Sequence, residues 1–226
     1  MMSLEAELAK IRTSIAQTAP GLWAENARQI GALIAANAAS GALGVGEVAP
    51  EFSLPATTGQ VVSSDVLLAR GPAVVVFFRG GWCPFCVAAM VAFDRVRSRL
   101  EHLGAALVGI APGSEDQAAE TARRLRLGFP LLADRELRAA RLFGLAHDLL
   151  PDLAEALERA GVDRSCLVGA WGTKLPIPAT YVIRRDGAVA WAFVDPDFTR
   201  RAEPEYVAAA VERLTAEDVS TVSVAR

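Results

Sequence analysis

The chain has 226 residues, of which 52% are hydrophobic, and its formal net charge is −3. This length and apolar content suit one compact α/β domain with an appendage. The near-neutral charge argues against a surface for nucleic acid or an anionic membrane. We expect no secretory signal, and the charge-free run over 29–46 is too weakly apolar for a membrane span. Because three cysteines make no secreted disulfide framework, we expect a cytoplasmic protein in a reducing compartment.

Two helices are predicted near the N-terminus, over 3–18 and 23–39, with a turn at Ala19-Pro20-Gly21 between them. The first carries an apolar stripe at helical spacing, made of Leu4, Leu8, Ile11 and Ile15. The stripe is expected to pack on the main domain or on a second subunit, so a homodimer stays open. We therefore divide the chain into an N-terminal helical extension (1–44), a main domain (45–205) and a C-terminal helix and tail (206–226).

Strands and helices alternate through the main domain. A hairpin is predicted over 51–62 and buried strands over 73–78 and 106–110. Further strands are predicted over 129–133, 180–183 and 189–194, and helices over 83–103, 114–125, 135–143, 151–160 and 205–215. The helix at 114 opens with the capping-box pattern Ser114-Glu115-Asp116-Gln117. This order predicts an α/β fold with a central mixed β-sheet flanked by helices.

The segment Phe77–Cys86, FFRGGWCPFC, follows a central strand and opens a helix. In such sheets, sites form beyond the carboxyl ends of the strands. Cysteines at i and i+3 of a first helical turn share one face, with Cβ atoms roughly 5–6 Å apart, and a disulfide needs about 3.5–4.5 Å. The free N–H groups and dipole of the helix start favour a thiolate, and Arg79 adds positive charge. Pro84 suits the first helical position. We infer a redox-active Cys83/Cys86 pair.

Other interpretations of the pair stay open: two buried structural cysteines, half of a zinc site, or a redox switch without turnover. No second CxxC or CxxH is present, so we predict no metal and no cofactor. His102 is expected to be solvated and His147 structural, while Cys166 is either inert or a resolving thiol. The charged residues that follow the last strand are expected to form a solvated or ion-paired surface: Asp195, Asp197, Arg200, Arg201 and Glu203.

Over residues 45–205 the chain resembles the peroxiredoxin-like branch of the alkyl hydroperoxide reductase/thiol-specific antioxidant family, within the thioredoxin-fold superfamily. The resemblance rests on four segments: VAPEFSLP (48–55), FFRGGWCPFC (77–86), Asp134 with LRAARLFGL (137–145), and PATYVIRRDG (178–187). It implies a thioredoxin-like fold in which Cys86 attacks peroxide.

The chain departs from the family pattern P-x-x-x-T-x-x-C, because Cys83 stands at the threonine position and Arg79 at the proline position. The position matching the family's later arginine is Pro178. We therefore expect slower peroxide reduction than in a full peroxiredoxin, since one lost preorganised donor typically costs about 10²–10³ in rate.

The substituted residues instead resemble two other families of the superfamily. Trp82 followed by Cys83 and Cys86 is similar to the thioredoxin motif, and Cys-Pro-Phe-Cys is close to the glutaredoxin form. Ile177-Pro178 resembles the loop in which those proteins hold a cis-proline beside the dithiol. The Ile177 backbone would then face Cys83 and pair with an extended substrate.

Three hypotheses follow. The first is an antioxidant thiol peroxidase, in which Cys86 attacks hydrogen peroxide or an organic hydroperoxide, Cys83 resolves it, and thioredoxin, glutaredoxin or glutathione restores the dithiol. The second is a disulfide reductase, in which a more exposed Cys83 attacks a disulfide substrate. The third is a non-enzymatic, redox-gated interaction protein whose helical extension meets the partner.

Overall fold

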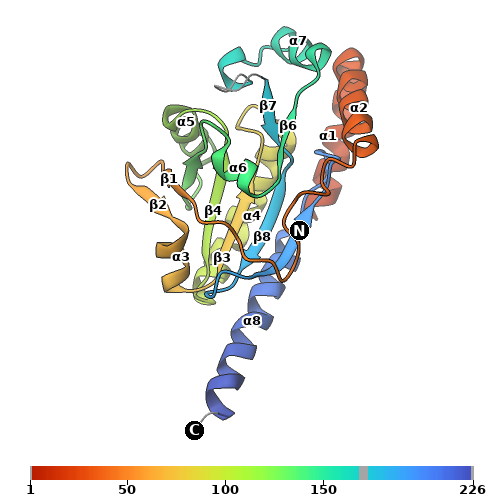
Figure 1. Ribbon diagram of the computed structural model, residues 1–226. Helices are drawn as coiled ribbons and strands as arrows, with labels where there is room; N and C mark the ends of the chain where they lie inside the picture. Colours follow the sequence, from red (N-terminus) through yellow and green to blue (C-terminus); the bar gives the residue numbers. More distant parts are fainter. Residues whose placement is uncertain (1, 168–172, 225–226) are drawn as a thin grey trace.

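A five-stranded mixed sheet forms the centre of the molecule (Figure 1). The computed structural model describes residues 2–167 and 173–224. The strand order is β5-β4-β3-β8-β9, with β3, β4 and β5 parallel and β8 antiparallel to both of its neighbours. The strands are β3 (Ala73–Phe77), β4 (Ala106–Ala111), β5 (Leu131–Ala133), β8 (Ala179–Ile183) and β9 (Val189–Val194). The predicted central mixed sheet is therefore confirmed.

The sheet is buried on both faces, as the apolar run in β3 predicts. Val74 and Val76 point into one hydrophobic cluster, while Val75 and Phe77 point into a second one on the opposite face. The first cluster is covered by α4 (Pro84–His102), α5 (Glu115–Leu125) and α8 (Pro204–Val224). The second is covered by α6 (Arg138–Leu142) and the hairpin β1 (Ser53–Pro55) and β2 (Val61–Ser63).

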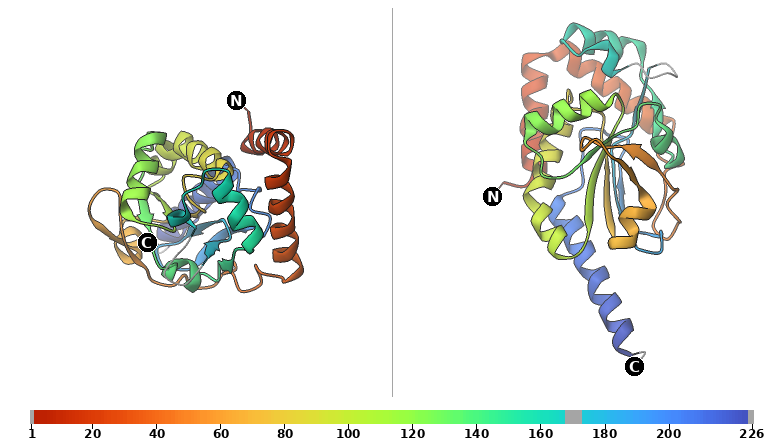
Figure 2. Two further views of the ribbon diagram at one scale, coloured as in Figure 1. Left: turned by 90° about the horizontal axis from the view of Figure 1, so that it is seen from above. Right: turned by 90° about the vertical axis from the view of Figure 1, so that its left-hand side faces the viewer.

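The N-terminal extension forms two helices, α1 (Leu4–Thr18) and α2 (Pro20–Ala35). Its apolar stripe packs within the chain, because Leu4 and Leu8 are buried in the first cluster and Ile11 and Ile15 lie against it. Helix α2 runs beside α7 (Pro151–Arg159) at the end of the molecule away from the projecting C-terminal helix (Figure 2). Leucines of α2 and α7 form a third cluster that includes Phe198.

Several elements differ from the sequence prediction. The helix α3 (Ser64–Arg70) and the hairpin β6 (Ala146–Asp148) and β7 (Lys174–Pro176) were not predicted, because each is too short to show a periodic pattern. Helix α8 continues to Val224, well past the predicted end at 215. The capping box at Ser114 is confirmed, with Ser114 Oγ accepting from Gln117 N and Gln117 Oε1 accepting from Ser114 N. None of the helices among the described residues combines the length and apolar character that a membrane crossing needs.

The loop between β3 and α4 approaches α5 so closely that one position admits only glycine. A Cβ atom on Gly81 would lie 2.2 Å from Thr121 Oγ1 of α5, and Arg124 Nη2 donates to the Gly81 carbonyl at 2.5 Å. The glycine therefore fixes where α4 begins.

We expect Gly81→Ala to lower the free energy of unfolding by about 1–3 kcal/mol, because the added methyl group overpacks against Thr121. Gly21→Ala is the matched control, since nothing lies within 4 Å of its Cβ position and it is helical; it should be neutral or slightly stabilising. Urea unfolding of both variants measures the difference, and equal stabilities would contradict the close packing.

Candidate active site

The two cysteines lie where the loop after β3 enters α4. Cys83 is the residue before the helix, Pro84 is its first residue, and Cys86 is its third. Val87 N donates to the Cys83 carbonyl at 2.9 Å, which closes the first turn. Pro84 thus occupies the predicted position, where no N–H is needed. Both thiols lie at the positive end of a 19-residue helix.

Both cysteines are inside the protein. Cys83 is 1% exposed and Cys86 is 0% exposed, and both belong to the first hydrophobic cluster. Both are free thiols. The expectation of a more exposed Cys83 is therefore wrong: Phe85 and the other residues of the cluster pack around the first turn of α4 and leave neither sulfur at the surface.

Cys86 is held by two donors and carries the negative charge. Arg201 Nη2 lies 3.1 Å from its Sγ, and the backbone N–H of Arg79 lies 3.4 Å from it. Burial alone would raise the pKa of Cys86, but the Cys83 thiol, the two guanidiniums of Arg201 and Arg79 and the Arg79 N–H together lower it to about 5. At neutral pH Cys86 is a thiolate.

Cys83 responds in the opposite direction. Burial raises its pKa, and the hydrogen bond to Cys86 and the negative charge of Cys86 raise it further. One proton is therefore shared unequally within the pair: Cys83 keeps it and donates toward the Cys86 thiolate. This asymmetry makes Cys86 the nucleophile of the resting state.

Arg79 lies between two aromatic rings beside the dithiol. Its guanidinium carbon is 3.9 Å from the ring centre of Phe198 and 5.0 Å from that of Trp82. The side chain is only 2% exposed. The sequence predicted Arg79 and Trp82 as supporting residues, and the structure brings both to Cys83 and Cys86. The sequence gives no indication that Phe198 belongs to the site, because Phe198 lies more than 100 residues from Cys86 along the chain.

Arg201 corrects the prediction of a solvated charged surface after β9. It is 8% exposed, and its Nη1 donates to the carbonyls of Phe198 and Arg200 at 2.5 and 2.6 Å. Arg200 and Asp195 follow the prediction of an ion-paired surface, since the exposed Arg200 pairs with the half-buried Asp195 at 2.8 Å. The position of Arg201 follows from the strand order: β9 runs parallel to β3, so its carboxyl end meets the same sheet edge, with Phe77, Ala179 and Val194 in register.

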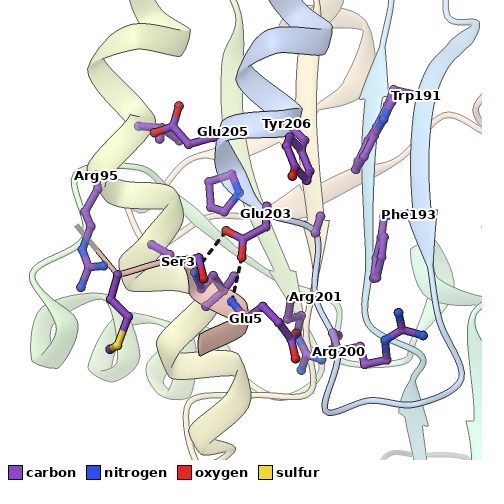
Figure 3. Close-up of a pocket in the computed structure, with 16 residues that line it drawn as sticks. Ser3, Glu5, Arg95, Trp191, Phe193, Arg200, Arg201, Glu203, Glu205 and Tyr206 are labelled. Carbon is purple, nitrogen blue, oxygen red and sulfur yellow. Dashed lines mark hydrogen bonds between the residues drawn. The ribbon is translucent and has the colours of Figure 1, made fainter. Parts of the chain in front are cut away.

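The loop that carries Arg201 is fastened to the N-terminal helix. Glu203 accepts hydrogen bonds from Leu4 N at 3.1 Å and Glu5 N at 2.7 Å, which caps α1 (Figure 3). Arg12 Nη1 donates to the Thr199 carbonyl at 3.3 Å. The sequence predicted a solvated or ion-paired Glu203; the structure instead has it bound by the free N–H groups at the start of α1.

A cavity of about 820 Å³ opens at this junction. Trp191 and Phe193 of β9 and Tyr206 of α8 supply aromatic lining, and Arg201 lines it as well (Figure 3). Arg201 therefore touches both this cavity and the Cys86 thiolate.

The predicted cis-proline loop is wrong. No peptide bond among the described residues is cis, so the Ile177–Pro178 bond is trans. Ile177 is buried, and its N–H donates to the Leu145 carbonyl at 2.8 Å, which extends the β6–β7 hairpin. The backbone that was to receive an extended substrate is already paired within the chain.

The remaining candidates lie outside the thiolate's contacts. His147 is buried in β6, where its Nδ1 meets the Asp148 carbonyl at 3.0 Å and burial lowers its pKa to about 4. His102 lies exposed at the end of α4. Cys166 accepts from Gln117 Nε2 at 3.2 Å and shares a cavity with Trp82, and burial raises its pKa. Its resolving role stays a prediction.

The fold and a buried, arginine-bound thiolate define a thiol-dependent peroxidase of the peroxiredoxin class. Residues 45–192 match the AhpC/TSA family model. A Mycobacterium tuberculosis (strain H37Rv) protein provisionally named a peroxiredoxin is 31% identical over 108 residues, which are 48% of this chain and 70% of the relative. Chloroplastic peroxiredoxin Q of Oryza sativa subsp. japonica is 26% identical over 153 residues, 68% of this chain and 60% of that protein. The chain belongs to the AhpC/TSA family.

Solved structures agree on the fold. Peroxidoxin BcpB of Mycobacterium tuberculosis superposes with a TM-score of 0.59 at 24% identity, over 75% of this chain and 96% of that one. Xanthomonas campestris peroxiredoxin Q superposes with a TM-score of 0.57 at 16% identity, over 73% and 91%. These structures confirm the predicted thioredoxin-like fold, while the family match and the peroxiredoxin relatives confirm the predicted peroxiredoxin function.

We expect the reduced protein to show one thiolate transition near pH 5 in absorbance at 240 nm, because Cys86 is protonated only below that pH. Arg201→Met should move this transition to higher pH, since it removes a positive charge next to the thiolate. Arg200→Met is the matched control and should leave it in place, because Arg200 is exposed and pairs with Asp195. A wild-type midpoint near 9 would contradict the assignment.

Proposed function

We propose that Cys86 reduces hydrogen peroxide or an organic hydroperoxide and that Cys83 resolves the oxidised product. The observation that carries this proposal is the contact between Arg201 Nη2 and Cys86 Sγ, 3.1 Å long and buried. A thiolate is the reactive form of cysteine, and Cys86 is the ionised thiol of the pair. Cys83, which is also buried, holds the proton instead.

The reaction balances within the pair and one solvent proton. The Cys86 thiolate attacks one peroxide oxygen, the O–O bond breaks, and the leaving alkoxide or hydroxide takes up a proton. Cys86 is then a sulfenic acid. The Cys83 sulfur, once deprotonated, attacks the Cys86 sulfur and expels hydroxide, which gives the Cys83–Cys86 disulfide and, after protonation, water. The dithiol loses two electrons and the peroxide gains them.

Three positions of the family pattern are filled differently here, and Arg79 stands at the first of them, where the family has proline. Cys83 stands where the family has threonine, and Pro178 stands where we matched its later arginine. Arg201 supplies a guanidinium to the thiolate from the loop after β9. This donor offsets part of the loss that the sequence predicts, because electrostatic stabilisation depends on where a donor points and not on where it lies in the chain.

The disulfide-reductase alternative loses its physical support. It needed an accessible Cys83 as the attacking thiolate and a backbone edge at Ile177 for the substrate. Cys83 is buried with a raised pKa, and Ile177 N is bound to Leu145.

A thioredoxin, glutaredoxin or glutathione system is proposed to reduce the disulfide in the cytoplasm. A vicinal disulfide at a helix start opens by exchange with an external thiol. This chemistry needs a reducing compartment to turn over.

Oxidation with one equivalent of hydrogen peroxide, followed by intact mass measurement and dimedone trapping, tests the roles of the cysteines. Wild type should lose two hydrogens as the disulfide forms. Cys83→Ser should stop at a sulfenic acid that dimedone traps on Cys86, and Cys86→Ser should stay unoxidised on this time scale.

Cys166→Ser is the control and should form the disulfide as wild type does, because no contact joins Cys166 to the pair among the described residues. Oxidation of Cys83 in Cys86→Ser at the wild-type rate would overturn the proposal.

A further inference from the structure

Arg79 is a buried cation whose hydrogen-bonding capacity is largely unused. Its Nε and Nη2 have no partner, although both atoms are inaccessible to solvent. A buried donor without a partner is unfavourable, so such groups usually meet a ligand or a charge at some stage of the protein's work. The positive charge of the guanidinium acts on both cysteines and favours the thiolate form of each.

The charges around the dithiol do not cancel. Arg79 and Arg201 each carry a positive charge, and Cys86 supplies one negative charge. Among residues 2–167 and 173–224, no ion pair joins either arginine to a carboxylate. His147, which faces Arg79 from β6, is neutral at neutral pH because burial lowers its pKa to about 4. The reduced site therefore holds one uncompensated positive charge.

The two arginines are not equivalent. Both terminal nitrogens of Arg201 are used, since Nη1 donates to the carbonyls of Phe198 and Arg200 and Nη2 donates to Cys86, and only its Nε has no partner. Arg79 is fixed only through its flat faces, by the rings of Phe198 and Trp82, and keeps its edge free. Stacking holds a guanidinium in place without using its N–H groups.

Oxidation of Cys86 changes the charge that Cys83 meets. In the reduced pair, the Cys86 thiolate opposes a second negative charge on Cys83. When Cys86 becomes a sulfenic acid, that opposition ends while both guanidiniums remain. The site then favours a thiolate on Cys83 for the same reason that it first favoured one on Cys86.

We propose that Arg79 activates Cys83 for the second chemical step, by stabilising the Cys83 thiolate that attacks the Cys86 sulfenic acid. In that step Cys83 releases its proton to solvent, the S–S bond forms, and the S–O bond of Cys86 breaks. The leaving hydroxide takes up one proton from solvent, so the net product besides the disulfide is one water molecule. Arg79 thus positions and stabilises the charged thiol in disulfide formation. Arg201 does the same for the Cys86 thiolate in peroxide attack. This assignment rests on the proposed peroxidase function.

Rapid mixing of reduced protein with hydrogen peroxide separates the two steps. Dimedone trapping measures the sulfenic acid, and intact mass measures the disulfide. We compare wild type, Arg79→Met and Arg79→Lys. Methionine keeps an unbranched apolar stem between the two rings but removes the charge, and lysine restores the charge.

In Arg79→Met the rate of disulfide formation should fall about tenfold or more at pH 7, since one pKa unit on Cys83 changes its thiolate fraction tenfold. Peroxide attack should slow much less, because Arg201 still binds Cys86. The sulfenic acid should accumulate, and excess peroxide should convert more of it to sulfinic acid. Arg79→Lys should recover at least part of the rate.

The pH profile distinguishes charge stabilisation from a general loss of structure. The midpoint of disulfide formation should move to higher pH in Arg79→Met, and the defect should disappear at a pH where Cys83 ionises without help. A defect of equal size at every pH, or an unchanged rate of disulfide formation, would overturn the role of Arg79. Failure of Cys86 to form a sulfenic acid in wild type would overturn the peroxidase function itself, which is a separate outcome.

Discussion

The active site depends on a thiolate that is fully buried, at Cys86. Removing an anion from water is costly unless fixed donors replace the lost hydration. At Cys86 those donors are the guanidinium of Arg201, the N–H of Arg79 and the start of α4. Each comes from a different part of the chain, so the site exists only when β3, α4 and the loop after β9 are assembled.

The N-terminal extension belongs to this assembly. Helix α1 is capped by Glu203, two residues from Arg201, and Arg12 binds the carbonyl of Thr199. Helix α2 packs with α7 around Phe198, whose ring covers Arg79. The extension therefore stabilises the loop that places both the arginine of the first step and the aromatic cover of the second. A loop of this kind would otherwise be among the most mobile parts of a domain.

The fold and the thiol pair could be predicted from the sequence, whereas contacts between segments that lie far apart in the chain could not. The apolar run of β3, the capping box at Ser114 and the stripe on α1 are local patterns, and each gave an element that the structure contains. Arg201 gave no such pattern, because its importance comes from strand order and not from neighbouring residues. The cis-proline expectation failed for a related reason: the β6–β7 hairpin, too short to recognise, takes up the backbone at Ile177.

If the peroxidase mechanism holds, Cys86 meets peroxide as a thiolate that the buried guanidiniums of Arg79 and Arg201 stabilise. The pH dependence of the second-order rate constant for oxidation of Cys86 by hydrogen peroxide, followed by the fluorescence of the adjacent Trp82, tests it most directly. We expect a rate that rises with a midpoint near pH 5 and is level through neutral pH. A rate that is small at neutral pH and rises only toward the ordinary thiol pKa of 9.0 would contradict it.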